Sequence, residues 1–198
     1  TINLLLAAVL RAESFAIENA AKEPDVVQLC KVLNSMGANI RGLGSDTLTI
    51  KQVRTLSGGT FRNDPDRIEV GTFIIAAAML PGSSLRLIGC NAEHLGDFPN
   101  LLRQTGTKVD VEGEIISVQA PEILKPVSIT TDIYPGVPTD LQAQWATMLT
   151  QAHGNSTVTD TVYFDRFSYV PELSRLGAQM KLTKNTVHIQ GPNVLEGA

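Results

Sequence analysis

One carboxylate stands where it could orient a hydroxyl group. Asp140 lies in the run Pro135-Gly136-Val137-Pro138-Thr139-Asp140-Leu141, in which the two prolines restrict the backbone ahead of a predicted helix. Thr139 is expected to cap that helix, and Asp140 is expected in its first turn. The helix dipole would keep such a carboxylate ionised, so it would orient a hydroxyl better than it would take up a proton. The simpler alternative is that Asp140 only stabilises the start of the helix.

The cysteines and histidines form no reactive or metal-binding pattern. Cys30 and Cys90 have neither CxxC nor metal-ligand spacing, and we interpret them as thiols that pack as small hydrophobic residues. They favour a reducing compartment, the cytoplasm, although two cysteines could also pair with each other. The spacing of His94, His153 and His188 places them on no common face. We therefore expect no metal site.

Composition excludes two classes of partner. The 198 residues are 43% hydrophobic and 18% charged, with a net charge of −4 and only 5% aromatic residues. Nucleic-acid binders usually carry clustered basic residues, and no such cluster is present. No stretch reaches the roughly 18 continuous apolar residues that a membrane span needs. We expect neither a nucleic acid nor a membrane as partner.

The elements that must position Asp140 come from a unit repeated three times. Residues 32–40, 101–109 and 172–180 match one another, and their central glycines, Gly37, Gly106 and Gly177, lie about 70 residues apart. Glycine readily takes the left-handed conformation that ends a helix, so each copy predicts a helix passing directly into a strand. Short β-branched strands follow at residues 48–50, 115–118 and 187–189.

A second segment keeps the same period. Residues 6–10, 75–79 and 144–148 are apolar nearly all round, which predicts helices buried on every side. Each unit then consists of a buried helix, a strand, an outer helix ending in glycine, and two strands. This pattern predicts an α/β fold of repeated βαβαββ-type units with sheets around buried helices.

A glycine-rich linker separates two predicted domains, residues 1–62 and 63–198. The linker is Ser57-Gly58-Gly59-Thr60, and a helix is expected to restart after it. Asp64 is the expected cap of that helix, and Pro65 its first residue.

The sequence resembles the UDP-N-acetylglucosamine enolpyruvyl transferases over essentially all of its length. Four motifs carry the resemblance in the same order. They are Asn19-Ala20-Ala21-Lys22-Glu23-Pro24-Asp25 with Met36-Gly37-Ala38, Pro65-Asp66-Arg67-Ile68-Glu69-Val70-Gly71-Thr72-Phe73, Pro135-Gly136-Val137-Pro138-Thr139-Asp140-Leu141-Gln142-Ala143-Gln144, and Asp165-Arg166-Phe167 leading into Pro171-Glu172-Leu173.

The resemblance implies a reaction and a domain plan. The enolpyruvyl group of phosphoenolpyruvate would pass to the 3′-hydroxyl of UDP-N-acetylglucosamine, with release of phosphate, in peptidoglycan synthesis and without a cofactor. The fold would be the inside-out α/β barrel of that family, here incomplete. Residues 1–62 would be the last unit of the catalytic-loop domain, and residues 63–198 about two units of its partner domain.

The resemblance also implies that more of the polypeptide is needed. Neither Cys30 nor Cys90 matches the family's reactive cysteine, and its Lys-Asn pair and phosphoenolpyruvate-binding arginines have no counterpart here. The first residues already read as an apolar helix, and we expect an internal fragment that is inactive without the remainder of the same polypeptide.

The site residues implied by the resemblance are few. Asp140 would contact the 3′-hydroxyl and act as the base, and Val162 would meet the nucleotide part through its backbone. Thr139 and Tyr163 complete the expected substrate-binding set. Alternatives are an ordinary strand-end role for Val162, a non-catalytic binding module of the same fold, and an enzyme acting on 3-phosphoshikimate.

One stretch departs from the family pattern. Where Glu-Asn-Arg-Phe-Met-His is common, this chain has Phe164-Asp165-Arg166-Phe167-Ser168-Tyr169. No role is therefore carried over to Phe164 or Tyr169. Arg166 matches the pattern, and we interpret it mainly as one half of a structural ion pair.

Overall fold

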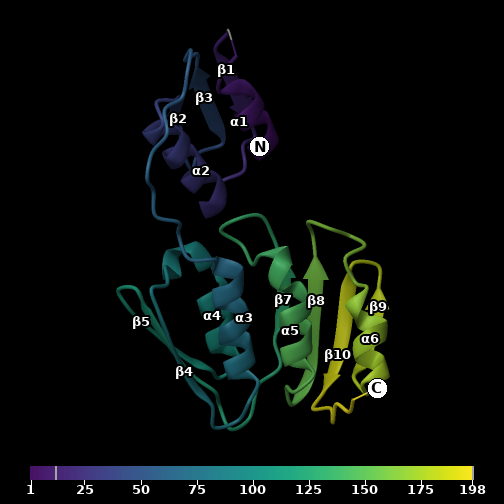
Figure 1. Ribbon diagram of the computed structural model, residues 1–198. Coiled ribbons are helices and arrows are strands. Elements are labelled where there is room, and N and C mark those ends of the chain that lie inside the picture. Colours follow the sequence, from purple (N-terminus) through teal and green to yellow (C-terminus); the bar gives the residue numbers. More distant parts are fainter. Residues whose placement is uncertain (12, 198) are drawn as a thin grey trace. The chain divides into compact units, whose positions relative to one another are not determined.

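A computed structural model describes residues 1–11 and 13–197. The chain divides into two compact units, Thr1–Asp64 and Pro65–Ala198 (Figure 1). Sequence placed the domain boundary between residues 62 and 63. That the two units belong to a catalytic-loop domain and to its partner domain stays a prediction.

The first unit is a three-stranded antiparallel sheet with two helices. Its strands lie in the order β1-β3-β2. Pro24 at the first helical position and Asp25 in the first turn favour the start of the second helix. The elements are α1 (Ile2–Ala8), β1 (Phe15–Glu18), α2 (Pro24–Ser35), β2 (Asn39–Arg41) and β3 (Thr47–Lys51).

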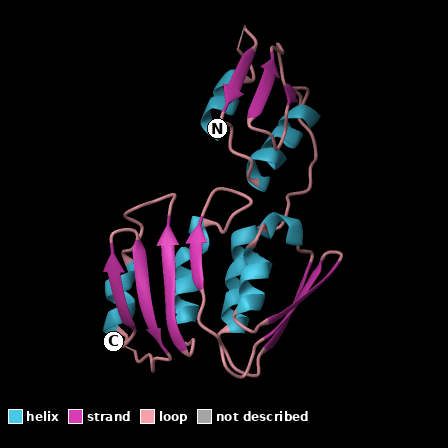
Figure 2. Ribbon diagram, turned by 180° about the vertical axis from the view of Figure 1, so that it is seen from behind, coloured by secondary structure: helices cyan, strands magenta, loops and turns pink. Residues whose placement is uncertain are grey.

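The second unit holds two sheets, each with helices on one face (Figures 1 and 2). The first sheet has the order β4-β6-β5, and the second has the order β7-β8-β10-β9. The elements of the first half are α3 (Arg67–Ala78), β4 (Ser84–Ile88), η1 (Ala92–Leu95), α4 (Phe98–Gln104), β5 (Lys108–Glu112) and β6 (Ile115–Gln119). Those of the second half are β7 (Ser128–Thr131), η2 (Thr139–Leu141), α5 (Gln142–Leu149), β8 (Gly154–Asp160), α6 (Tyr169–Arg175), β9 (Gln179–Thr183) and β10 (Thr186–Gly191).

The predicted repeat is confirmed. Each copy has the strand order first-third-second, as β1-β3-β2, β4-β6-β5 and β8-β10-β9, and every pairing within a copy is antiparallel. Gly37, Gly106 and Gly177 follow α2, α4 and α6 and precede β2, β5 and β9. Their φ angles of 103°, 93° and 104° lie in the region that glycine tolerates and other residues avoid. Strand β7 is added at one edge, parallel to β8.

In the second unit, burial on every side is confirmed for α5, which has no exposed residue, whereas α3 is covered only in part: Phe73 is 51% exposed and Ala76 is also exposed. Helix α3 contacts both α5 and its own sheet, and α5 contacts β8 and β10. Trp145 of α5 is completely buried, and its ring meets Phe98 edge-on at a centroid distance of 5.5 Å. Apolar residues all round α5 are stable because neighbouring elements cover every face of that helix.

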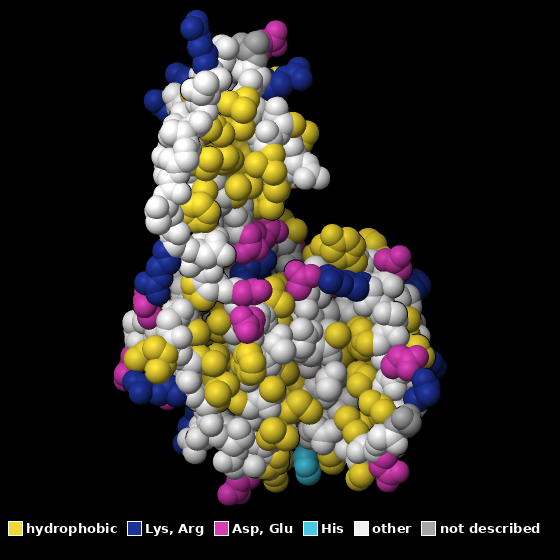
Figure 3. Space-filling model, viewed as in Figure 1, with side chains coloured by type: hydrophobic (Ala, Val, Ile, Leu, Met, Phe, Trp, Pro, Cys, Tyr) yellow, Lys and Arg dark blue, Asp and Glu magenta, His cyan; other side chains and the backbone are white. Residues whose placement is uncertain are grey.

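For α1 the prediction of burial on every side is wrong. Only Leu5 and Ala8 of this helix are buried, whereas the exposed fraction of Leu4 is 62% and that of Leu6 is 49%. The reason is that the first unit has a single three-stranded sheet, which covers one side of the helix. Figure 3 shows apolar side chains gathered on the visible face of this unit.

The start of α3 also differs from the prediction. Asp66, not Asp64, is the cap, since its Oδ1 accepts hydrogen bonds from the N–H groups of Ile68 at 2.8 Å and Glu69 at 3.2 Å. Pro65 therefore precedes the cap and is not the first helical residue. A carboxylate reaches the free N–H groups two and three residues ahead of it, and from position 66 these belong to the helix that forms.

Candidate functional site

Three segments meet at the carboxyl end of β8. Strands β7 and β8 are parallel, so both end at the same edge of their sheet, and η2 follows β7 at that edge (Figure 1). The inward-facing positions of β8 are Ser156, Val158 and Asp160, all at most 1% exposed. The last residue of the strand thus places a carboxylate inside the protein.

Asp160 accepts four hydrogen bonds. Oδ2 accepts from Thr139 Oγ1 and from Gln142 Nε2, both at 2.5 Å. Oδ1 accepts from the backbone N–H groups of Val162 and Tyr163, both at 2.8 Å. Three of the four predicted site residues, Thr139, Val162 and Tyr163, therefore touch one carboxylate.

The protonation of Asp160 follows from these bonds. Burial alone would raise the pKa of this carboxyl, but hydrogen bonds from Thr139 and from the backbone N–H groups of Tyr163 and Val162 outweigh it and hold the pKa below its ordinary value. Asp160 is thus an anion at neutral pH, buried among neutral donors. Burial, and secondly the charge of Asp160, raise the pKa of the Tyr169 phenol.

Asp140 lies outside this buried cluster, in the η2 turn. Its Oδ1 is 2.8 Å from Nη1 of Arg166, and the side chains of the pair are 47% and 46% exposed. The same nitrogen is 3.4 Å from Thr139 Oγ1, and the guanidinium lies over the Tyr163 ring, 5.6 Å from its centroid. Arg166 forms an ion pair, as interpreted from the sequence, and its partner is Asp140; that the pair is structural stays a prediction.

The predicted capping role of Thr139 is wrong. Pro138 and Leu141 occupy the cap positions of η2 and α5, and neither position shows a side-chain cap. The hydroxyl of Thr139 donates to the buried carboxylate of Asp160 instead. Asp140 lies in the short turn before α5 and not in the first turn of α5 itself.

Sequence reasoning missed Asp160 and Gln142. A signal for Asp160 was present: it continues the inward-facing alternation of Ser156 and Val158 along the strand. A carboxylate at an inward position requires donors, and the nearest in sequence are the N–H groups that follow the strand. Gln142 gave no such signal, because it reaches Asp160 only through the fold.

The cysteines are not activated nucleophiles. Cys30 and Cys90 are free and buried, and burial raises the pKa of both thiols. A reactive cysteine needs the opposite, a lowered pKa and access to solvent. The interpretation of both as packed thiols is confirmed.

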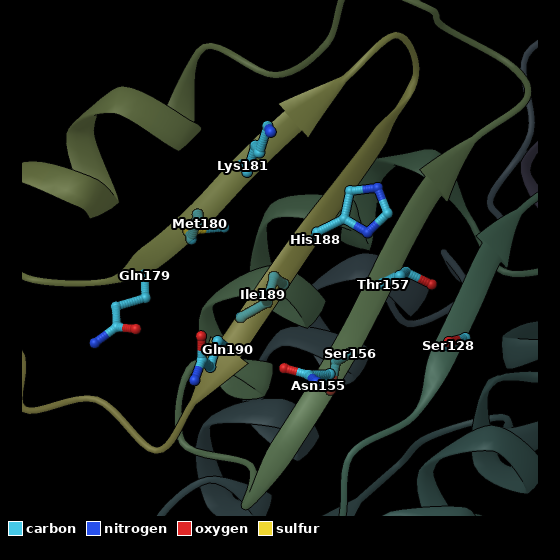
Figure 4. Close-up of a pocket in the computed structure, with 10 residues that line it drawn as sticks. All are labelled: Ser128, Asn155, Ser156, Thr157, Gln179, Met180, Lys181, His188, Ile189 and Gln190. Atoms are coloured by element: carbon cyan, nitrogen blue, oxygen red, sulfur yellow. The ribbon is translucent and has the colours of Figure 1, made fainter.

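A second polar feature lies apart from Asp140 and Asp160. A hollow of about 690 Å³ opens on the sheet β7-β8-β10-β9, and Figure 4 shows His188 and Thr157 on neighbouring strands within it. None of the predicted site residues lines it. Within residues 1–11 and 13–197, no group of three or more His, Cys, Asp or Glu side chains could hold a metal ion. In the same described part of the chain, no helix is long and apolar enough to cross a membrane.

Comparison with known proteins gives the family. The model of EPSP synthase (3-phosphoshikimate 1-carboxyvinyltransferase) matches residues 1–198. The UDP-N-acetylglucosamine 1-carboxyvinyltransferase of Chlorobaculum parvum is 45% identical over the whole chain, which covers 46% of that protein. UDP-N-acetylglucosamine 1-carboxyvinyltransferase 2 of Clostridium tetani is 44% identical, with 47% of it covered. The chain thus spans about half the length of these relatives.

Solved structures agree with the sequence matches. The enolpyruvyl transferase NikO from Streptomyces tendae superimposes with a TM-score of 0.85 at 28% identity, covering 98% of this chain and 46% of that one. The EPSP synthase of Acinetobacter baumannii shares the fold, with a TM-score of 0.50 at 16% identity. The repeat, the topology and a family match along the entire chain lead to one conclusion: this chain belongs to the EPSP synthase family.

Proposed function

We propose that this chain forms part of an enzyme that transfers the enolpyruvyl group of phosphoenolpyruvate to the 3′-hydroxyl of UDP-N-acetylglucosamine. Relatives named for that activity are 40–45% identical over the whole chain, which supports this choice within the family. The observation that carries the proposal is Asp140, a half-exposed carboxylate held by Arg166 at the open end of β8.

Asp140 is the proposed base. In the reaction the acceptor oxygen forms a bond to the enolpyruvyl carbon, the hydroxyl proton is lost and phosphate leaves. A carboxylate within hydrogen-bonding reach of the hydroxyl can orient it and take its proton. Asp140 remains accessible for this contact, whereas Asp160 is completely buried and already accepts four hydrogen bonds.

Val162 and Tyr163 are proposed to meet the nucleotide part of the acceptor. Their N–H groups both donate to Asp160, so the contacts are assigned to their carbonyl oxygens and side chains. The hydroxyl proton of Thr139 also points to Asp160, and Thr139 would therefore act on a ligand only as an acceptor. The substrate contacts expected of these three residues are thus limited to atoms that do not already donate to Asp160.

The remaining assignments follow from the same proposal. The reaction belongs to peptidoglycan synthesis, and the two free thiols suit the reducing cytoplasm. The unit Thr1–Asp64 is assigned to the catalytic-loop domain and the unit from Pro65 to its partner domain. Phosphoenolpyruvate would be held mainly by residues that the longer relatives have beyond the matched half.

A chimera tests the proposal. The matched segment of the Chlorobaculum parvum enzyme is replaced by these 198 residues, and phosphate release from phosphoenolpyruvate is measured. We expect release only when UDP-N-acetylglucosamine is added, and none detectable from the 198 residues alone. Positioning and electrostatic groups act together, so a part of the site is expected to lose several orders of magnitude in rate.

Two outcomes contradict it. Release that depends on shikimate 3-phosphate would favour the other named activity of the family. A folded chimera that binds UDP-N-acetylglucosamine without turnover would indicate a non-catalytic binding module. The unsubstituted Chlorobaculum parvum enzyme, assayed alongside, shows that the assay detects turnover.

A further inference from the structure

We propose that Asp160 is a positioning residue, whose buried carboxylate fixes the Thr139–Asp140 segment relative to the Val162–Tyr163 backbone. The part of this proposal that concerns turnover rests on the proposed function. Asp160 itself touches no substrate, because it is completely buried.

The partners of the Asp160 carboxylate come from two separate segments of the chain. Each carboxylate oxygen accepts two hydrogen bonds, Oδ2 from the segment that holds Asp140 and Oδ1 from the turn after β8. The backbone of Asp160 is fixed as well. Its N–H donates to the Asn185 carbonyl at 2.9 Å, and Asn185 Nδ2 donates to its carbonyl at 2.8 Å. A carboxylate held on all sides can act as a fixed reference for both segments.

Thr139 and Arg166 connect Asp160 to Asp140. A threonine hydroxyl has one proton, and that of Thr139 goes to Asp160. Its lone pairs then face Nη1 of Arg166, 3.4 Å away, and this nitrogen is 2.8 Å from Asp140. The charge of Asp160 thus sets the orientation of Thr139, and Thr139 helps to set where Arg166 holds Asp140.

The substitution Asp160→Asn reverses the direction of the hydrogen bond between Thr139 and residue 160, with little change in side-chain size. Its amide oxygen can still accept from Val162 and Tyr163, so its NH₂ group must face Thr139. Thr139 then becomes an acceptor toward residue 160, and its proton turns toward the Arg166 side, where it repels the guanidinium. The Gln142 side chain can rotate to present its Oε1, a buried atom without a hydrogen-bond partner among the described residues.

The test is a double-mutant cycle in the Chlorobaculum parvum chimera. Asp160→Asn, Thr139→Val and the double variant are compared by kcat and KM for UDP-N-acetylglucosamine, per folded enzyme as determined from a thermal melt. Asp165→Asn, an exposed carboxylate in the same loop, is the matched control. We expect Asp160→Asn to lower kcat by about tenfold to a hundredfold, since small misplacements of reacting groups have effects of this size.

The cycle separates positioning from general stability. If Asp160 acts through Thr139, the double variant is no slower than the slower single variant. Additive losses, or an unchanged kcat per folded enzyme in Asp160→Asn, would overturn the proposal. Activity similar to the unsubstituted chimera is expected for Asp165→Asn.

A second measurement does not depend on turnover. In the 198-residue chain, amide proton shifts of Val162 and Tyr163 and the side-chain N–H signal of Arg166 are recorded by NMR. In Asp160→Asn all three signals are expected to move, and in Thr139→Val only that of Arg166. A chimera without turnover but with these shifts contradicts the proposed function and not the positioning. An Arg166 signal that stays in place in both variants overturns the positioning.

Discussion

Nη1 of Arg166 lies 2.8 Å from Oδ1 of Asp140, and both side chains are about half exposed. An exposed ion pair contributes little to stability, typically about 0–1 kcal/mol, because water competes for both charges. The contact is therefore better explained as one that orients the Asp140 side chain than as one that stabilises the fold. It fixes a carboxylate whose other oxygen can face an approaching hydroxyl.

Replacing Arg166 by Gln is expected to affect activity more than stability. In the chimera, kcat/KM for UDP-N-acetylglucosamine should fall by about tenfold or more, since Asp140 loses the charge-assisted hydrogen bond that orients it. The melting temperature should change little. Steady-state kinetics and a thermal melt on the same preparation measure both.

The matched control is Arg175→Gln. Arg175 pairs with Glu172 at 2.9 Å, and both side chains are 66% exposed, so the same change removes a comparable surface ion pair in α6. Its kcat/KM is expected to stay normal. Equal losses of activity in the two variants would mean that the Arg166 contact has no special part in the site.

The pH dependence of stability should report on Asp160. Its pKa in the folded chain is below the ordinary value, which is about 3.9 for an unfolded chain. Its stabilising contribution is thus complete above that pH and is lost as the pH falls through the folded pKa. Melting temperatures of the wild type and of Asp160→Asn should differ most near pH 7 and converge toward pH 3.

Other carboxyl groups also lose charge in acid, so the comparison needs a reference. Asp165→Asn removes an exposed carboxylate from the same loop and should follow the wild-type curve at every pH. A gap between wild type and Asp160→Asn that stays constant from pH 7 to pH 3 would show that folding does not lower the pKa of Asp160.

The loop before Asp140 depends on close approach at Gly96. A Cβ added there would lie 2.1 Å from the carbonyl oxygen of Pro135, and that oxygen is already fixed by the N–H of Asp97 at 2.9 Å. Gly96→Ala should cost about 1–3 kcal/mol for the overlap, beyond roughly another 1–3 kcal/mol for a backbone with a φ of 56° and a ψ of −129°, which residues other than glycine rarely adopt. Urea denaturation measures the loss.

Gly82→Ala separates the two costs. Gly82 has a φ of 76°, close to the 56° of Gly96, but an added Cβ there meets nothing within 4 Å. We expect it to lose only the conformational part. Equal free energies of unfolding for the two variants would mean that the Pro135 loop moves freely and does not fix the approach to Asp140.

Much of the fold could be predicted because its determinants are local. Gly37, Gly106 and Gly177 mark the same helix end in each unit. A helix that ends at glycine and passes into a strand can be predicted from neighbouring residues alone, without any distant contact. The error in α1 has the opposite origin. An apolar helix is predicted to be buried, but the number of its faces that are buried depends on the neighbouring elements.

The site was predictable only in part for a similar reason. Asp140, Thr139, Val162 and Tyr163 were named from a resemblance, yet the bond between Thr139 and Asp160 crosses from η2 to β8. Local reasoning gave Thr139 a helix-capping role, because that is the nearest use for a hydroxyl before a helix. The parallel pairing of β7 and β8 places the Asp160 carboxylate within reach of the Thr139 hydroxyl. Neither segment alone predicts that the two strands pair.

The most direct test of the account is Asp140→Asn in the chimera, measured by steady-state kinetics beside a thermal melt. The change keeps the size of the side chain and removes its charge. Acceptor binding should weaken by about tenfold to a hundredfold for the lost charge-assisted hydrogen bond, and turnover should fall by a further 10²–10⁴-fold or so for the lost base. The free energy of unfolding should change by less than about 1 kcal/mol, the size of an exposed ion pair. A clear drop in melting temperature with near-normal turnover would contradict the account, because Asp140 would then only stabilise its turn.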